Sequence, residues 1–299
     1  MRIDPNTTPN ILQDLQQSQT VLNTALEQVA TGFSVNNPSD NPTAAAEMVQ
    51  NTLESANVDQ YTQNVASALS TVHTASSVLS SVVSSHTSAV SAGTEGGSGT
   101  NSTANFQALA SQVQGILTSV VNAANTSVSG SFLFGGTSTA TPYTADASSP
   151  TGYTYNGNND TNSIAIGDQT SVQVNLPGSQ IFSSSSNNVI GALSSLVTAL
   201  QSGNTTNIQT STAAVSSALN FVGQQQVFYG NAETQLNSQE TFLQQDTVSL
   251  TTQATNLIGV NEATAATDLS QAETDNSAAL AAVAKVLPNS LLNFLSPPE

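Results

Sequence analysis

Residues 58–89 read VDQYTQNVASALSTVHTASSVLSSVVSSHTSA, and their pattern indicates the fold class. Its apolar positions are separated by alternating steps of three and four residues without a break. They are Val58, Tyr61, Val65, Ala68, Val72, Ala75, Leu79, Val82, His86 and Ala89. This spacing places one apolar stripe along a helix, and its persistence indicates a long coiled-coil-like helix. We predict that the helix ends near Gly93, because a glycine-rich turn over 96–99 follows.

A shorter stripe of the same kind precedes this helix. Its members alternate by steps of four and three and are Ile11, Leu15, Ser18, Leu22, Ala25 and Val29. We expect Gly32 to end that helix and a polar loop over 36–42 to follow. Asn41 and Pro42 then form a helix-start signal, with Asn41 as the N-cap and Pro42 in the first helical position.

Helical periodicity also dominates the second half of the chain. We predict helices over about 105–125, from 189 to about 200, from about 205 onward, and near the C-terminus. The last helix carries Leu269, Leu280, Val283 and Leu287, and we expect Pro288 to end it. An apolar tail follows, with Leu291, Leu292, Phe294 and Leu295.

The segment from about 130 to 186 has a different character. It is rich in Gly, Pro, Tyr, Thr and Asn, and it contains short period-two runs such as 163–166 and 171–176. Such runs between turn residues indicate a small β-rich insert. We expect its anchoring core to consist of Phe132, Phe134, Tyr143 and Tyr155.

The order helices, insert, helices predicts a mainly α fold with a small β-rich domain inserted in the middle. The N- and C-terminal arms should pack as a long antiparallel coiled-coil-like bundle, because an insertion leaves the ends of its host close together. We predict three parts: a terminal helical domain (1–45 and 258–299), a helical rod domain (46–130 and 187–257) and a β-rich outer domain (131–186).

Composition excludes several functions. The chain has 299 residues and two basic side chains, Arg2 and Lys285, against 19 acidic ones, giving a formal net charge of −17. Nucleic-acid binding depends on Lys and Arg, so it is not expected, and an anionic membrane surface is disfavoured for the same reason. No apolar run is long enough for membrane insertion. Cysteine is absent, so there is no thiolate metal site, and the N-terminal sequence lacks the apolar segment of a cleaved signal peptide.

No catalytic, cofactor or metal-binding constellation stands out, so we expect a non-enzymatic chain without a cofactor. His73 and His86 are not at a ligand spacing, and we interpret them as helix-face or interface residues. Residues 156–160 (NGNND) cluster oxygen ligands as a calcium loop does, but the downstream Glu is missing, so a hairpin turn is favoured.

Two terminal patterns resemble the flagellin family. One is ATG at 30–32 followed by NPSDNP at 37–42, and the other is NEATAATDL at 261–269 followed by SLLNFL at 290–295. The family usually carries basic residues after its Thr-Gly pair, whereas Phe33, Ser34 and Val35 stand here. The resemblance covers essentially the whole chain.

The middle segment resembles one branch of that family more closely. Its pattern is GSFLFGG at 130–136, Pro142-Tyr143, YNGN at 155–158 and GSQIF at 178–182. This pattern implies a structural subunit that joins the flagellar hook to the filament. Filament flagellin itself is one alternative, and a secreted adhesin or enzyme built on a flagellin scaffold is another.

The resemblance also implies partners and a location. The subunit would be exported through the flagellar type III system, without signal cleavage, after binding a cytoplasmic chaperone, and would reside in the extracellular flagellum. Its partners would be a hook-associated protein, flagellin and copies of itself. The terminal helices would form an inner layer that folds on assembly, with Asp268, Glu273 and Asp275 solvated or facing a neighbouring subunit.

The assembly interface expected from this resemblance lies on the apolar stripes of the two terminal helices and on the apolar tail. Its residues are Ile11, Leu15, Leu22, Val29, Leu269, Leu280, Val283, Leu287, Leu291, Leu292, Phe294 and Leu295.

Overall fold

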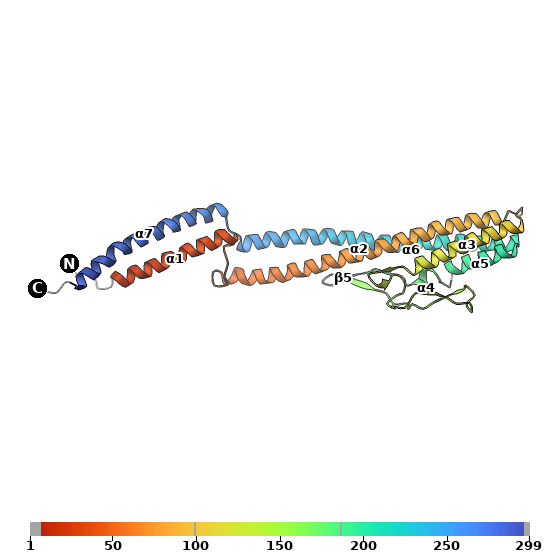
Figure 1. Cartoon of the computed structure of the whole chain (residues 1–299), viewed down its shortest axis with the longest axis horizontal. Helices are drawn as coiled ribbons and strands as arrows, with labels where there is room; N and C mark the ends of the chain where they lie inside the picture. Colours follow the sequence, from red (N-terminus) through yellow and green to blue (C-terminus); the bar gives the residue numbers. More distant parts are fainter. Residues whose placement is uncertain (1–6, 99, 186, 296–299) are drawn as a thin grey trace. The chain divides into compact units, whose positions relative to one another are not determined.

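A computed structural model describes residues 7–98, 100–185 and 187–295, and the side chains of residues 7–9, 11 and 286–295 lie outside this description. The chain is mainly helical with small strand pairs in the middle, which confirms the predicted fold class (Figure 1). The helices of the described part are α1 (Thr7–Thr31), α2 (Pro42–Gly96), α3 (Thr103–Ala124), α4 (Gly178–Ile181), α5 (Val189–Ser202), α6 (Thr205–Ile258) and α7 (Glu262–Leu295). The strands are β1 (Ser127–Val128), β2 (Ser131–Phe132), β3 (Tyr143–Ala145), β4 (Tyr153–Tyr155), β5 (Ser163–Gly167) and β6 (Thr170–Gln173).

The chain forms two compact units. Unit 1 consists of residues 1–57 and 245–299, and unit 2 consists of residues 58–244. Helices α2 and α6 contribute residues to both units. The finer division into three parts that the sequence suggests stays a prediction.

In unit 1, α1 packs along α7 (Figure 1). Helix α1 ends at Thr31 because Gly32 adopts a φ of 75°, a conformation that glycine tolerates best. The connections that follow α1 and precede α7 pair with each other, since Phe33 and Gly259 form an antiparallel bridge. The Ser34 N–H donates to the Ile258 carbonyl at 2.6 Å. The segment after α1 and the segment before α7, which are far apart in the sequence, are therefore joined by backbone hydrogen bonds.

The polar loop before α2 is held by its own side chains. The Asp40 carboxylate accepts hydrogen bonds from the backbone N–H groups of Asn37 at 2.8 Å and Asn36 at 3.1 Å. The bond from Asn37 is the main reason why the pKa of Asp40 lies below its usual value. The Asn41 side chain accepts from the Ala44 N–H at 3.1 Å, which confirms Asn41 as the N-cap of α2.

Within unit 1, α2 and α6 are fixed against each other by a buried amide. Asn51 is 4% exposed, and its Nδ2 donates to the Leu250 carbonyl and to Gln253 Oε1, both at 3.0 Å. A polar group in an otherwise apolar seam specifies one register, because any shift would leave it unpaired.

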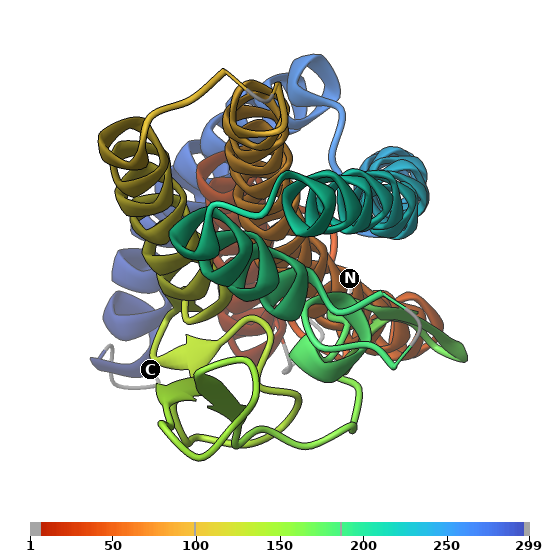
Figure 2. The ribbon, with the colours of Figure 1, turned by 90° about the vertical axis from the view of Figure 1, so that its right-hand side faces the viewer.

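In unit 2, the stripe over 58–89 is the core seam of α2, as predicted, and Tyr61 is its half-buried member. Four helices meet near Gly96, where an added Cβ would lie 2.5 Å from Leu200 Cδ2, 3.5 Å from Ile208 and 3.6 Å from Leu109. Figure 2 shows α2, α3, α5 and α6 end-on, with the strand pairs gathered on one side of them. The bundle therefore needs the small residue at this crossing.

The insert has an aromatic core. The Phe134 and Phe182 rings contact edge to face with centroids 5.1 Å apart, and Tyr143 lies 5.1 Å from Tyr155. The Tyr143 hydroxyl donates to the Gly178 carbonyl at 2.8 Å. The predicted roles of Phe134, Tyr143 and Tyr155 are confirmed.

The observed aromatic core differs from the predicted one at two residues. Phe132 is half-buried and lines a groove instead. Phe182, which the sequence prediction omitted, completes the core, because the short helix α4 turns its ring inward.

The hairpin of β5 and β6 is attached to both long helices. Asn64 on α2 donates to the Ala165 carbonyl at 2.8 Å, and Gln239 on α6 donates to the Ile166 carbonyl at 2.9 Å. Ile166 itself is fully buried. The hairpin therefore covers the α2–α6 seam at this level of unit 2.

One helix boundary differs from the sequence prediction. Helix α7 continues through Pro288 to Leu295. A proline inside a helix removes one backbone N–H donor and crowds the carbonyl four residues earlier, which costs about 3 kcal/mol. The helical backbone nevertheless continues on both sides of Pro288.

We predict that Gly178→Ala destabilises unit 2 by about 1–3 kcal/mol, because overpacking forces atoms in a full core to move. An added Cβ would lie 2.9 Å from the Phe134 carbonyl oxygen and 3.0 Å from the Tyr155 ring. Chemical denaturation measures the change. Gly230→Ala is the control, since nothing lies within 4 Å of its added Cβ and a helical alanine stabilises by roughly 0.5–1 kcal/mol. Equal effects of the two substitutions would contradict the packing of this core.

His86 predicts a pH dependence. It is fully buried, its Nδ1 lies 3.0 Å from the Val82 carbonyl, and its Nε2 has no partner in hydrogen-bond geometry. Burial lowers the pKa of His86, and the backbone carbonyls of Val82 and Val189 oppose the shift.

Below the ordinary histidine pKa of 6.5, the unfolded chain therefore binds a proton that the folded chain excludes. We expect the free energy of unfolding of unit 2 to be constant above neutral pH and to fall as the pH drops below 6.5. His86→Leu should remove this fall, whereas His73→Gln, at an exposed position, should keep it. A wild-type chain whose stability does not change between neutral pH and pH 5.5, about one unit below that pKa, would refute the prediction.

Candidate assembly surface

Few side chains of α1 are buried in its contact with α7. Ala25 is 6% exposed, whereas the predicted interface residues Leu15 and Leu22 are half-buried. Val29 is 44% exposed. The seam with α7 is thus built around a small residue, and the larger side chains of α1 are only partly covered.

The α7 side has the same organisation. Ala265 and Ala272 are buried, Leu269 and Val283 are half-buried, and Leu280 is 47% exposed. An apolar side chain with half its surface in water gains only part of its burial energy of about 1.5–3 kcal/mol. Leu280 is thus available for a further contact.

Part of the predicted interface lies outside the described side chains. This applies to Ile11, Leu287, Leu291, Leu292, Phe294 and Leu295, and their roles stay predictions.

The sequence prediction missed a second apolar face of α1. Leu12 is 47% exposed and Leu26 is 45% exposed, and their separation of two heptads places both on one side of the helix. Val21 is also exposed. In the sequence, these residues are apolar positions of α1 outside the predicted stripe. Apolar positions on a second face indicate a helix that needs partners on more than one side.

A groove of about 460 Å³ runs between α1 and α7. Its lining is mainly amide, hydroxyl and small apolar side chains. These residues are Gln17, Thr20, Val21, Thr24, Ala25, Gln28, Asp268, Gln271, Ala272 and Asp275. Asp268 and Asp275 are exposed there, and Glu273 is exposed on the same helix.

Two polar atoms of this pair are buried without a hydrogen-bond partner. They are the Ser18 hydroxyl oxygen on α1 and the Asn276 Oδ1 on α7. An unsatisfied buried polar group costs about 1–3 kcal/mol. The α1–α7 pair therefore carries polar groups that its own helices do not satisfy.

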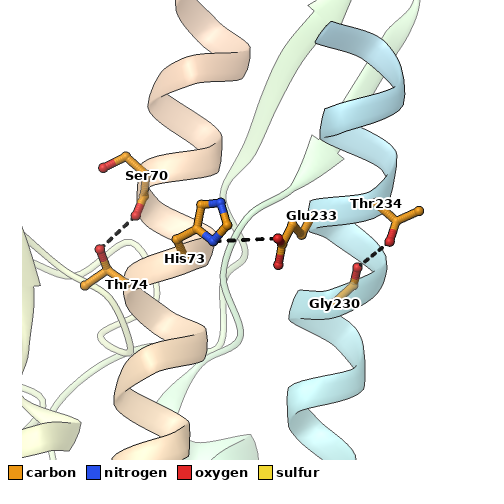
Figure 3. Close-up of polar contacts among 6 residues, drawn as sticks. All are labelled: Ser70, His73, Thr74, Gly230, Glu233 and Thr234. Carbon is orange, nitrogen blue, oxygen red and sulfur yellow. Dashed lines mark hydrogen bonds and ion pairs between the residues drawn. The ribbon is translucent and has the colours of Figure 1, made fainter. Parts of the chain in front are cut away.

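The structure offers little for catalysis in the described residues. His73 on α2 faces Glu233 on α6 with an Nδ1 to Oε1 distance of 3.7 Å (Figure 3). The neighbouring hydroxyls of Thr74 and Thr234 donate to carbonyls of their own helices. Neither of these two hydroxyls is therefore directed at the imidazole, and an exposed pair of this kind contributes roughly 0–1 kcal/mol to stability.

Residues 156–160 do not form the hairpin turn that the sequence predicted, because they connect β4 to β5 and these strands belong to different pairs. Asn158 Oδ1 accepts from the Thr137 N–H at 2.8 Å, and Asn158 Nδ2 donates to Asp160 at 2.9 Å. Among the described residues, no three His, Cys, Asp or Glu side chains are grouped to hold a metal ion. A groove of about 800 Å³ between α2 and the insert is lined by hydroxyl, amide and apolar side chains only.

The described helices include none with the length and apolarity to cross a membrane. The α1–α7 pair, with its partly covered apolar faces, is therefore the candidate functional surface of the chain.

The N-terminal part of the chain, which includes α1, is similar to a known protein family. Residues 6–139 match the model of the bacterial flagellin N-terminal helical region. This part of the chain is therefore similar to the N-terminal region of bacterial flagellin. This flagellin region spans α1, α2, α3 and the first strand pair, so it includes half of the α1–α7 pair. No curated protein sequence matches the chain.

Solved structures share the fold. A putative flagellar hook-associated protein from Vibrio parahaemolyticus aligns with a TM-score of 0.68 and 18% identity, over 74% of this chain and all of that one. FlgL of Bacillus cereus aligns with a TM-score of 0.60 and 21% identity, over 69% of this chain and 99% of that one. The flagellar junction protein FlgL of Legionella pneumophila aligns with a TM-score of 0.60 and 14% identity, over 71% and 100%. The flagellin region thus sits in a chain with the fold of these hook-associated proteins.

We predict that Ser18→Ala stabilises the isolated α1–α7 pair by about 1 kcal/mol, because it removes a buried hydroxyl without a partner. Thr20→Ala is the control, since the Thr20 hydroxyl is exposed and bonded to the Gln16 carbonyl. Thermal melting followed by far-ultraviolet circular dichroism should show the helical arms of Ser18→Ala melting at higher temperature. A lower melting temperature would mean that the hydroxyl has a partner in solution.

Proposed function

We propose that the protein is a structural subunit of the bacterial flagellum that joins the hook, through another hook-associated protein, to the flagellin filament. The observation that carries the proposal is the α1–α7 pair. It combines a flagellin-type N-terminal region with apolar faces that the chain leaves partly exposed. Such surfaces become stable when further helices pack against them.

The middle of the chain favours the junction over filament flagellin. The pattern over 130–182 builds the aromatic core of the insert, in which Tyr143 and Tyr155 bond to backbone carbonyls of distant segments. The structures that share the fold are described as hook-associated and junction proteins. A filament subunit is the second candidate, because a flagellin N-terminal region is expected in a junction subunit and in a filament subunit alike.

Contacts with other subunits would be made without many ion pairs. The chain supplies two basic side chains against 19 acidic ones. Copies of it repel each other electrostatically, so their attraction must come from apolar burial and from amide and hydroxyl bonds. The groove between α1 and α7 offers Gln, Thr and Ala side chains for such contacts, beside the carboxylates of Asp268 and Asp275.

The remaining elements of the proposal concern location and chemistry. The protein would leave the cell through the flagellar type III system, with a cytoplasmic chaperone on its terminal helices, and would lie in the extracellular flagellum. It would bind neither nucleic acid nor a membrane and would catalyse no reaction.

Immunogold electron microscopy on intact cells tests the proposed location. An antibody to residues 131–186 should label one cluster at the hook–filament boundary. Label along the whole filament would make the protein a flagellin. Flagella without label would refute any flagellar role.

We predict that Leu280→Asp blocks incorporation into flagella while leaving unit 2 folded. The side chain is 47% exposed in the isolated chain, so the aspartate is tolerated there but would be desolvated in a helical contact. Swimming should be lost, and far-ultraviolet circular dichroism of the purified chain should be unchanged. Val227→Asp is the control, at a 60% exposed position in unit 2. Normal swimming of the Leu280 variant would contradict the proposed interface.

A further inference from the structure

The groove between α2 and the insert is a second candidate site, and all of its lining residues belong to unit 2. Its volume of about 800 Å³ lies within the range of about 300–1,000 Å³ that is typical of small-molecule sites. Helix α2, the β1–β2 hairpin and the ends of the β5–β6 hairpin all contribute to the lining. Asn175 is 5% exposed there, and its Oδ1 accepts a hydrogen bond from the Asn162 N–H at 2.6 Å. The groove is therefore bordered by elements that are fixed to one another.

The groove presents serine hydroxyls that have no protein partner. Five lining serines make no side-chain hydrogen bond within the described part of the chain, and they are Ser67, Ser70, Ser129, Ser131 and Ser163. The hydroxyl of Thr71, which also lines the groove, donates instead to the Ser67 carbonyl at 3.0 Å. Figure 3 shows the Ser70 side chain pointing away from α6. A hydroxyl can donate one hydrogen bond and accept two, so these serines offer both donors and acceptors to a ligand.

Ser129 holds a backbone conformation that serine does not favour. Its φ is 52°, a positive value that no other non-glycine residue adopts in the described part of the chain, and the φ of Gly130 beside it is 84°. Two-residue hairpin turns with positive φ at both positions usually carry Asn, Asp or Gly at the first one, and a glycine there would be unstrained. The strained position instead places a hydroxyl in the groove. Strain of this kind clusters at functional sites.

The chemistry of the lining restricts the kind of ligand. Among the described residues that line the groove, none is Asp, Glu, His, Lys or Arg. An anion would be repelled by the formal net charge of −17, and a cation would find no carboxylate with which to pair. A wholly apolar ligand would bury the serine hydroxyls without partners, which is unfavourable. The lining therefore favours an uncharged ligand that carries hydroxyl groups of its own.

Phe132 supplies an apolar surface for such a ligand, because this half-buried side chain lines the same groove. One face of a sugar ring presents C–H groups that can pack on an aromatic ring, while the hydroxyls at its edge stay free for hydrogen bonds. We propose that the groove binds a short neutral carbohydrate, with Phe132 against one sugar ring and the serine hydroxyls bonded to sugar hydroxyls. This binding activity goes beyond the proposed function and does not depend on it.

Saturation-transfer difference NMR on the purified full-length chain at neutral pH tests the proposal. The neutral probes are glucose, galactose, N-acetylglucosamine, maltose and cellobiose. The charged probes are N-acetylneuraminic acid, which is an anion, and glucosamine, which is a cation. We expect saturation transfer to one or more of the neutral sugars and not to the two charged ones. Absence of transfer to every neutral sugar, or equal transfer to the charged sugars, would overturn the proposal.

Substitutions in the groove should weaken the same binding. Phe132→Leu keeps an apolar side chain but removes the ring, and Ser70→Ala removes a hydroxyl from an exposed position of α2. Each should raise the Kd of the bound sugar several-fold. Ser129→Gly should do the same, although glycine adopts the φ at this position without strain and therefore keeps the turn.

Ser77→Ala is the matched control for these variants. Ser77 is an exposed serine about two turns further along α2, and it does not line the groove. Its replacement should leave the Kd unchanged, and thermal melting followed by circular dichroism should show all four variants folded. Unchanged affinity of the three groove variants, or an equal loss of affinity in Ser77→Ala, would overturn the proposed site.

Discussion

The structure depends on the thinness of the apolar seam between paired helices. Residues such as Val65, Ala68 and Val72 give α2 a single stripe, and one partner helix cannot surround it. In unit 2, α3, α5 and the β5–β6 hairpin cover the rest of this stripe, and Ile166 of the hairpin is fully buried. Unit 1 has no such cover among its described residues, and its exposed apolar side chains follow from that difference.

Scarcity of basic residues is the second constraint. With a formal net charge of −17, the chain can form few ion pairs, so its specific polar contacts are made by amides and hydroxyls. Asn51 sets the α2–α6 register, and Asn125 holds Tyr143 by accepting from its N–H at 2.7 Å and donating to its carbonyl at 2.8 Å. Hydroxyls on the long helices mostly donate to the carbonyl one turn earlier, as Thr87 does to Val83. Exposed helix faces are consequently uncharged over long stretches, which allows like-charged copies to approach each other.

Much of this could be predicted from the sequence, because helical periodicity is a local property. The stripe over 58–89 predicted the core of α2, and Asn41 with Pro42 predicted where that helix begins. The aromatic core of the insert was predicted in part, and Phe182 was missed because its position depends on the short helix α4. Pro288 was wrongly expected to end α7, which continues to Leu295.

The candidate site was harder to predict than the fold. Periodicity identified Leu15, Leu22 and Leu269 as seam residues, but it assigned a helix one apolar face. It missed Leu12 and Leu26 on α1, because these residues become meaningful only when the partner of the helix is known. The unpaired atoms of Ser18 and Asn276 likewise depend on tertiary packing, which no local pattern contains.

Unit 1 leaves apolar side chains uncovered that further subunits would cover, whereas the apolar seam of unit 2 is covered by its own elements. Amide hydrogen exchange on the purified chain and on intact flagella measures this difference. We predict that amides of α1 and α7 exchange rapidly in the purified chain and slowly in flagella, whereas the α2 core over 65–89 is protected in both. Equal protection of α1, α7 and the α2 core in the purified chain would contradict it.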